Sequence, residues 1–287
     1  MIEVLDPGAL LTVQDSGRHG YAHLGVSPSG ACDPRAARVA NLLVGNRVRD
    51  AVLETTLTGA VLRAHEGAVI AVTGAQADVF VGDVPAPRGR PVRLGAGQVL
   101  EVGAAISGMR NYIAVRGGVD VPAHLGSRAT DTLSGLGSDP LRAGDRLEIG
   151  ASAAAAQDLF AGPFAEPDRV PGPHEQVTLT LEPGPRADWI RDTGDLETRV
   201  FTASADSNRI GLRLTGPALA WAREGELASE GLVAGAVQVP PGGQPVIFLA
   251  DHPTTGGYPV MGVLDAASLS LAAQVRPGQP VVLALAS

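Results

Sequence analysis

The stretch LADHPTTGGYP, residues 249 to 259, gathers groups that could bind and activate an oxygen-containing ligand. Asp251 follows the apolar run VIFLA, so its carboxylate is expected where a strand ends and a loop begins, within reach of a ligand. We predict that Asp251 is catalytic and that the hydroxyl and N–H groups after it hold a carboxylate, carbonyl or phosphate oxygen. The alternative is a glycine turn in which Asp251 caps its own backbone. The predicted substrate-binding residues are Thr254, Thr255, Gly256, Gly257 and Tyr258.

Three further residues of the second half are predicted to act with Asp251. His252 is a candidate general acid or base, although a loop histidine is often simply solvated. In SNRIGLRL, Arg209 and Arg213 would share one face of a strand, and Arg209 is the better candidate to clamp an anion. Gln238 can donate to and accept from an amide such as urea or a lactam. We expect Asp251→Asn to keep the turn and the melting temperature but to lower turnover.

The first half carries a second set of polar residues. One part follows an apolar run near the start of the chain, and the other lies in RGGVDV and GSRATD. These residues could line a second site or face a partner protein, and we favour the partner contact. They are Gln14, Asp15, Arg18, Arg116, Arg128 and Asp131.

Composition excludes several classes of function. Hydrophobic residues make up 45% and charged residues 18% of the 287 residues, which is typical of a folded protein. A net charge of −8 argues against nucleic acid as a partner. No basic and apolar leader opens the sequence and no uncharged run could span a membrane, so we expect a cytoplasmic protein.

Missing residue types narrow the chemistry further. All 22 basic residues are arginine, which excludes a Schiff-base lysine, a P-loop lysine and a biotinylated lysine in this chain. The single cysteine, Cys32, rules out an intrachain disulfide and a cysteine metal cluster. His19 and His23 are only a weak zinc candidate, so no metal site is predicted. Neither a Walker A loop nor a G-x-G-x-x-G motif is present.

The elements that must position these residues are mostly strands. Short β-branched segments punctuated by Gly and Pro predict strands within 68–82, 111–121, 145–150, 176–184, 244–251 and 279–286. Two short helices are predicted, after Asp33-Pro34 and after Asp265, each with the aspartate as its N-cap. An alanine-rich and then proline-rich segment, 151–176, is predicted to link a domain at 1–150 to one at 177–287.

Four long segments resemble the allophanate hydrolase subunit 2 family, which also includes the C-type subunits of 5-oxoprolinase and biotin-dependent carboxyltransferase-like proteins. The chain departs from the family pattern in GACDP for GAMDP, SNRIG for SNRMG, and His252-Pro253 for Arg-Gln in the TTGGYP motif. The last change places the substrate in question more than the fold. The segments are LLTVQDSGRHGYAHLGVSPSGACDP (10–34), RNYIAVRGGVDVPAHLGSRATDTLSGLG (110–137), SADSNRIGLRLTGPAL (204–219) and SEGLVAGAVQVPPGGQPVIFLADHPTTGGYP (229–259).

This resemblance implies two cyclophilin-like β-barrel domains and a partner of the family's subunit 1, or B-type, class. It also adds Ser229 and Glu230 to the predicted substrate-binding residues, because they lie in the shared segment. The implied activity is that of one subunit in an ATP-dependent amidohydrolase, such as 5-oxoprolinase with a third lactam-utilisation subunit, which opens 5-oxo-L-proline to glutamate. Two alternatives remain open: half of a urea or amide carboxyltransferase with biotin on another chain, and a regulatory antagonist of a histidine-kinase inhibitor. The resemblance does not place the ATP site in this chain.

Overall fold

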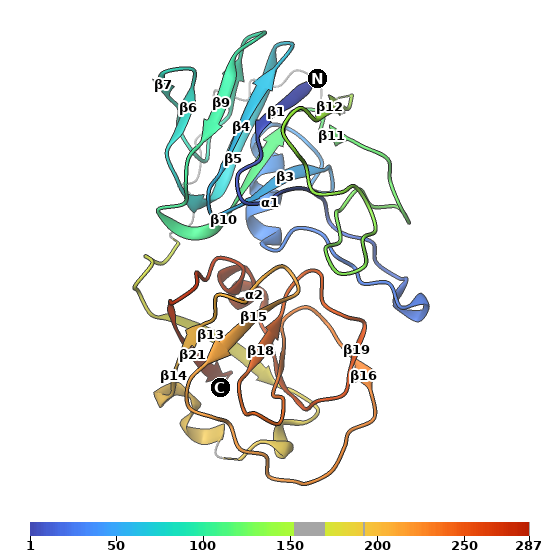
Figure 1. Ribbon diagram of the computed structural model, residues 1–287, viewed down its shortest axis with the longest axis vertical. Helices are drawn as coiled ribbons and strands as arrows, with labels where there is room; N and C mark the ends of the chain where they lie inside the picture. Colours follow the sequence, from blue (N-terminus) through green and yellow to red (C-terminus); the bar gives the residue numbers. More distant parts are fainter. Residues whose placement is uncertain (152–169, 192, 287) are drawn as a thin grey trace. The chain divides into compact units, whose positions relative to one another are not determined.

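The computed structural model describes residues 1–151, 170–191 and 193–286, mostly as strands and turns (Figure 1). The mainly β prediction is confirmed, and each of the six predicted strand segments contains a strand. Most of the predicted linker, 151–176, lies outside the described residues.

The chain divides into two compact units, but not at a single point along the sequence. The first unit contains Met1–Arg18, Asp33–Asp131 and Gly135–Val170. The second contains His19–Cys32, Thr132–Ser134 and Pro171–Ser287. The predicted boundaries, 1–150 and 177–287, did not anticipate that two short segments of the first half belong to the second unit.

The first unit is built from two antiparallel sheets around one apolar core. Val4, Val13, Leu53, Val72 and Ile113 are fully buried in this core. The seven-stranded sheet has the order β11 (Val119–Asp120), β12 (Arg146–Ile149), β1 (Ile2–Asp6), β4 (Ala60–Ala64), β9 (Val99–Val102), β6 (Val79–Val81) and β7 (Val84–Pro85). The five-stranded sheet has the order β2 (Leu11–Gln14), β3 (Val52–Thr56), β10 (Ser107–Val115), β5 (Ala68–Gln76) and β8 (Val92–Leu94).

The helix α1 (Pro34–Leu43) lies against β5 and β10 of this unit. As predicted, Asp33 is its N-cap, and the Asp33 carboxylate accepts from the Ala36 N–H at 3.0 Å. Ala40 packs inward with no exposure, and the Thr73 hydroxyl donates to the Ala36 carbonyl at 2.8 Å. The amphipathic face therefore fixes how the helix covers the sheet.

The second unit is a closed seven-stranded barrel. Its strands run in the order β13 (Val177–Pro183), β20 (Val260–Leu264), β17 (Ala236–Gln238), β18 (Val246–Phe248), β15 (Gly211–Thr215), β14 (Val200–Ala203) and β21 (Pro280–Leu285). The pair β13 and β21 is parallel, and the other neighbours are antiparallel. Leu179, Phe201, Val237 and Leu283 fill the interior.

Shorter elements complete the second unit. As predicted, Asp265 caps α2 (Ala266–Ala272), accepting from the Ser268 N–H at 2.6 Å. A two-stranded ribbon, β16 (Glu230–Gly231) with β19 (Thr255–Gly256), lies outside the barrel order. The 3₁₀ turns are η1 (Ala22–Leu24), η2 (Ala187–Trp189) and η3 (Thr193–Thr198).

Candidate functional site

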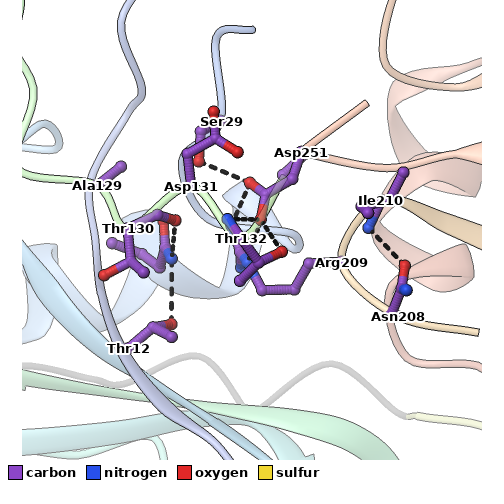
Figure 2. A network of polar contacts seen from close by, with 12 residues as sticks. Thr12, Ser29, Ala129, Thr130, Asp131, Thr132, Asn208, Arg209, Ile210 and Asp251 are labelled. Carbon is purple, nitrogen blue, oxygen red and sulfur yellow. Dashed lines mark hydrogen bonds and ion pairs between the residues drawn. The ribbon is translucent and has the colours of Figure 1, made fainter. Parts of the chain in front are cut away.

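Asp251 lies at the end of the chain segment that continues β18, fully buried in an ion pair with Arg209. Arg209 grips the carboxylate with two nitrogens, Nε to Oδ2 at 2.9 Å and Nη2 to Oδ1 at 3.0 Å. The Ser29 hydroxyl donates to Oδ1 at 2.6 Å, and Thr132 donates to Oδ2 from its N–H at 2.9 Å and its hydroxyl at 2.7 Å (Figure 2). Arg209 Nη2 also donates to the Gly30 carbonyl at 2.6 Å. We call these five residues the Asp251 network.

The Asp251 carboxylate accepts five protein hydrogen bonds, which fill the roughly four lone-pair positions of a carboxylate. These surroundings suit a group that holds segments in place. The catalytic role of Asp251 and Arg209 stays a prediction.

Ser29, Gly30 and Thr132 were missed by the sequence analysis. They lie in 19–32 and 132–134, the two first-half segments that belong to the second unit. Ser29 adopts a left-handed φ of 53°, which is uncommon for a residue with a side chain and is held here by its bond to Asp251. The sequence SPSG around Ser29 indicates a turn. No local pattern shows that the partner of Ser29 lies 222 residues away.

The pKa of Asp251 is set by opposing effects. Burial favours the neutral acid, but the charge of Arg209 and the hydrogen bonds from Arg209, Ser29 and Thr132 outweigh it, so the pKa lies below its usual value. The folded protein thus binds this proton more weakly than the unfolded chain does. The resulting stability is present above the unfolded pKa of about 3.9 and is lost as the pH falls through the lower folded value.

We therefore expect acid to destabilise the parent protein more steeply than Asp251→Asn below about pH 4. Thermal unfolding of both proteins between neutral and acidic pH measures this difference, because carboxylates elsewhere titrate equally in the two. If the melting temperatures of the two proteins fell in parallel over this whole pH range, the lowered pKa of Asp251 would be contradicted.

His252 is buried, with 2% of its surface exposed, and its Nδ1 lies 2.8 Å from the Pro253 carbonyl oxygen. The simple alternative of a solvated loop histidine is therefore wrong. Its predicted acid or base role stays a prediction.

Gln238 and the glycine turn form a second group in the same unit. Gln238, at the end of β17, is 5% exposed, and its Nε2 donates to the Tyr258 carbonyl at 2.9 Å. A Cβ atom on Gly256 would lie 2.7 Å from that Nε2 and 2.9 Å from Leu232 Cδ1. Gly256 is thus needed for Gln238 to reach the turn, and the amide keeps Oε1 and a second N–H for a ligand, because this is its one side-chain hydrogen bond among the described residues.

The ribbon brings Glu230 to this group, because Glu230 pairs with Gly256 across β16 and β19. Directly paired residues project to the same face. Arg186 holds the Glu230 carboxylate through Nε, at 3.1 and 3.2 Å from its two oxygens, and through a further bond from Nη2. This hydrogen bond from Arg186 is the main reason why the pKa of Glu230 lies below its usual value. Arg186, Glu230, Gln238 and Gly256 are called the Gly256 cluster; sequence reasoning missed Arg186, which lies in an unremarkable Gly-Pro-Arg turn.

The remaining predicted substrate-binding residues lie along the same ribbon and the turn that follows it. Thr255 pairs with Gly231, so it faces the side of the ribbon opposite Gly256 and is exposed. The Thr254 carbonyl accepts from the Leu232 N–H at 2.9 Å, which continues the ribbon. Tyr258 is 46% exposed, and Ser229 is exposed at the start of β16. Gly257 has room for a side chain, because an added Cβ atom would meet nothing closer than the Leu227 carbonyl oxygen at 3.6 Å.

The predicted residues of the first half form a network inside the first unit. Gln14 donates to Thr12 Oγ1 at 3.0 Å and to the Thr130 carbonyl at 2.9 Å. Arg18 donates to the Ala129 carbonyl and lies 3.8 Å from Asp131. Gln14, Arg18 and Asp131 are at most 1% exposed, so the expectation that they face a partner is wrong for these three.

The other three members are more accessible. Asp15 accepts from the Ser127 hydroxyl at 2.6 Å and from the Arg128 N–H at 2.7 Å. The Arg128 side chain, 40% exposed, pairs with Asp120 at 2.6 Å. Arg116 follows β10 and is half-buried. A partner contact by Asp15, Arg116 and Arg128 stays a prediction.

The first unit also contains a buried polar group that the sequence did not indicate. The Tyr112 hydroxyl donates to Glu54 at 2.8 Å and accepts from the Asp33 N–H at 2.7 Å. Arg110 lies 3.7 Å from the same Glu54 carboxylate. These contacts join α1 to β3 and β10 and give the group a structural role.

Metal-binding clusters are absent from the described part of the chain, where no three His, Cys, Asp or Glu side chains gather as around a metal ion. Among the same residues, no helix is long and apolar enough to cross a membrane.

Comparisons with known proteins place this geometry in context. The model of the family described as "Carboxyltransferase domain, subdomain A and B" matches residues 24–285. The C-type subunit of 5-oxoprolinase from Escherichia coli is 37% identical over 292 residues, covering 98% of this chain and 90% of that protein. The urea amidolyase of Lachancea kluyveri is 34% identical, with 97% of this chain but 16% of that protein covered.

Solved structures agree with the sequence comparisons. The urea amidolyase of K. lactis matches all of this chain and 19% of its own length, with 32% identity and a TM-score of 0.87. The urea carboxylase of Kluyveromyces lactis matches all of this chain and 27% of its own length, with 32% identity and a TM-score of 0.88. The chain therefore corresponds to a small part of these longer proteins.

Proposed function

Because the chain belongs to the carboxyltransferase domain, subdomain A and B, family, we propose that it is the C-type subunit of an ATP-dependent 5-oxoprolinase. This complex would open the lactam 5-oxo-L-proline to L-glutamate. The observation that carries the proposal is coverage: the chain spans nearly all of the Escherichia coli 5-oxoprolinase relative, but only a small part of the urea amidolyases.

The Gly256 cluster supports recognition of an amide. Gln238 offers both an acceptor and a donor, which match the N–H and carbonyl of a lactam, and its position is fixed by Tyr258. The exposed Tyr258 and Ser229 would line the approach. Asp251 and Arg209 would hold the segment that leads into this turn, as positioning residues.

ATP and partner subunits complete the proposal. No Walker A loop occurs in the sequence, so we assign ATP binding to the complex without placing it in this chain. The partners would be a homologue of the B-type subunit and a lactam-utilisation subunit. Asp15, Arg116 and Arg128 remain candidates for the partner contact.

The alternative function is one half of a urea or amide carboxyltransferase. It is favoured by the family description and by the likeness to urea carboxylase. Because the chain contains no lysine, its biotin would be carried by another chain.

The test is co-expression with the B-type and lactam-utilisation homologues of the same genome. We expect a complex that survives gel filtration and hydrolyses ATP only when 5-oxo-L-proline is present, releasing glutamate. Urea and bicarbonate with a biotinylated carrier serve as the comparison. Carrier decarboxylation that depends on urea, without any response to 5-oxo-L-proline, would favour the carboxyltransferase instead.

A further inference from the structure

Arg186 reaches the Gly256 cluster from a separate part of the barrel. It follows β13, and its N–H donates to the Val260 carbonyl of β20 at 3.2 Å. From there its side chain forms an ion pair with Glu230. Glu230 pairs with Gly256 across the two-stranded ribbon, and the Gln238 amide lies close to Gly256. Glu230 and Gly256 therefore connect the Arg186 guanidinium to the amide that we assign to substrate recognition.

The contact with Glu230 occupies only one edge of this guanidinium. Glu230 is held by Nε and Nη2, and none of the hydrogen bonds of the described residues involves Nη1. The edge formed by Nη1 and Nη2 thus keeps a second fork of donors, of the kind that binds carboxylates with two hydrogen bonds. The side chain is 37% exposed, so a ligand can reach it.

Glu230 fixes the orientation of the Arg186 guanidinium. A free arginine samples many rotamers, whereas one held by a carboxylate presents its open edge in a fixed direction. Glu230 also neutralises the charge of Arg186, so the cluster attracts a carboxylate through directed hydrogen bonds more than through net charge.

We propose that Arg186 is a specificity-determining residue that binds a carboxylate carried by the amide substrate, with Glu230 as its positioning residue. The proposal rests on the proposed function, since 5-oxo-L-proline carries a carboxylate next to its lactam ring. Gln238 would bind the lactam and Arg186 the carboxylate. Urea has no carboxylate, so an Arg186 of this kind distinguishes the two substrate classes.

The experiment measures 5-oxo-L-proline-dependent ATP hydrolysis by the complete complex with Arg186→Gln. Loss of two charge-assisted hydrogen bonds is expected to raise KM roughly ten- to hundredfold, with a smaller change in kcat. Inhibition by 2-pyrrolidinone, the same lactam without a carboxylate, should be unchanged. Arg186→Lys, which keeps the charge but not the fork, should fall between the two.

Two controls separate this role from a simple ion pair. Arg223→Gln breaks the nearby pair with Asp188, whose side chains are 56% and 55% exposed, and should leave KM unchanged. The double variant Arg186→Gln with Glu230→Gln leaves no unpaired carboxylate and should keep the raised KM.

The outcomes separate the two proposals. A KM for Arg186→Gln equal to that of Arg223→Gln, recovery in the double variant, or an equal loss of 2-pyrrolidinone inhibition would overturn the role of Arg186. A parent complex without any response to 5-oxo-L-proline would instead overturn the proposed function, and this inference with it.

Discussion

Asp251→Asn is expected to lower the free energy of unfolding by about 3–5 kcal/mol, because it leaves the charge of Arg209 buried without its partner. Asparagine keeps the size of the side chain, but its amide nitrogen would replace one carboxylate oxygen. Its N–H groups would then face Ser29, Thr132 or Arg209, which are themselves donors. The measurement is urea or thermal unfolding of the parent and the variant under the same conditions. The expectation from the sequence alone is an unchanged melting temperature, because asparagine can still accept the backbone hydrogen bonds of a local turn.

Asp195→Asn provides the matched control. Asp195 also pairs with an arginine, Arg199, at 2.9 Å, but its side chain is 53% exposed. Breaking such a surface pair costs within about 1 kcal/mol. If Asp251→Asn unfolds like the parent yet loses activity in the complex, the positioning role is wrong and the catalytic prediction stands.

Gly256→Ala is expected to lower the activity of the complex strongly while leaving the fold intact. The added Cβ atom would lie 2.7 Å from Gln238 Nε2 and 2.9 Å from Leu232 Cδ1, both at the ends of flexible side chains. Gln238 must therefore move and lose its bond to Tyr258. Misplacing a buried amide costs about 1–3 kcal/mol, roughly a five- to hundredfold loss of kcat/KM.

Gly257→Ala is the control for this effect. The site has no left-handed φ, and the nearest atom to its Cβ would be 3.6 Å away. The melting temperature and kcat/KM of this variant should stay close to those of the parent. Equal losses in the two alanine variants would show that the turn itself, and not the position of Gln238, limits activity.

Local sequence patterns were sufficient to predict six segments that contain strands and both α-helices. Asp33-Pro34 and Asp265 carry capping signals that depend only on neighbouring residues, and short β-branched, apolar segments bounded by Gly or Pro mark strands such as β13 and β21. The family resemblance added the fold of the barrel. These features follow from interactions within a few residues or from patterns shared along the whole chain.

The partners of the charged residues could not be predicted in this way. Arg18 and Gln14 look like surface residues in a sequence, because most charged and amide side chains are exposed. They are buried because carbonyl groups more than 100 residues away accept from them, at Ala129 and Thr130. The pairing of Arg186 with Glu230 is equally invisible, since no repeat or spacing connects a turn after β13 to the start of β16.

The exchange of segments has a consequence for dissecting this protein. Ser29 and Thr132, which donate hydrogen bonds to Asp251, are encoded in the first half of the gene. Both nevertheless belong to the unit that holds the barrel. A single cut within 151–176 would therefore produce a C-terminal fragment that contains every barrel strand. In this fragment Asp251 would lack the donors of Ser29 and Thr132, and Arg209 would lack the Gly30 carbonyl. Gene order and structural unit do not coincide here, so the barrel is not a transplantable module of contiguous sequence.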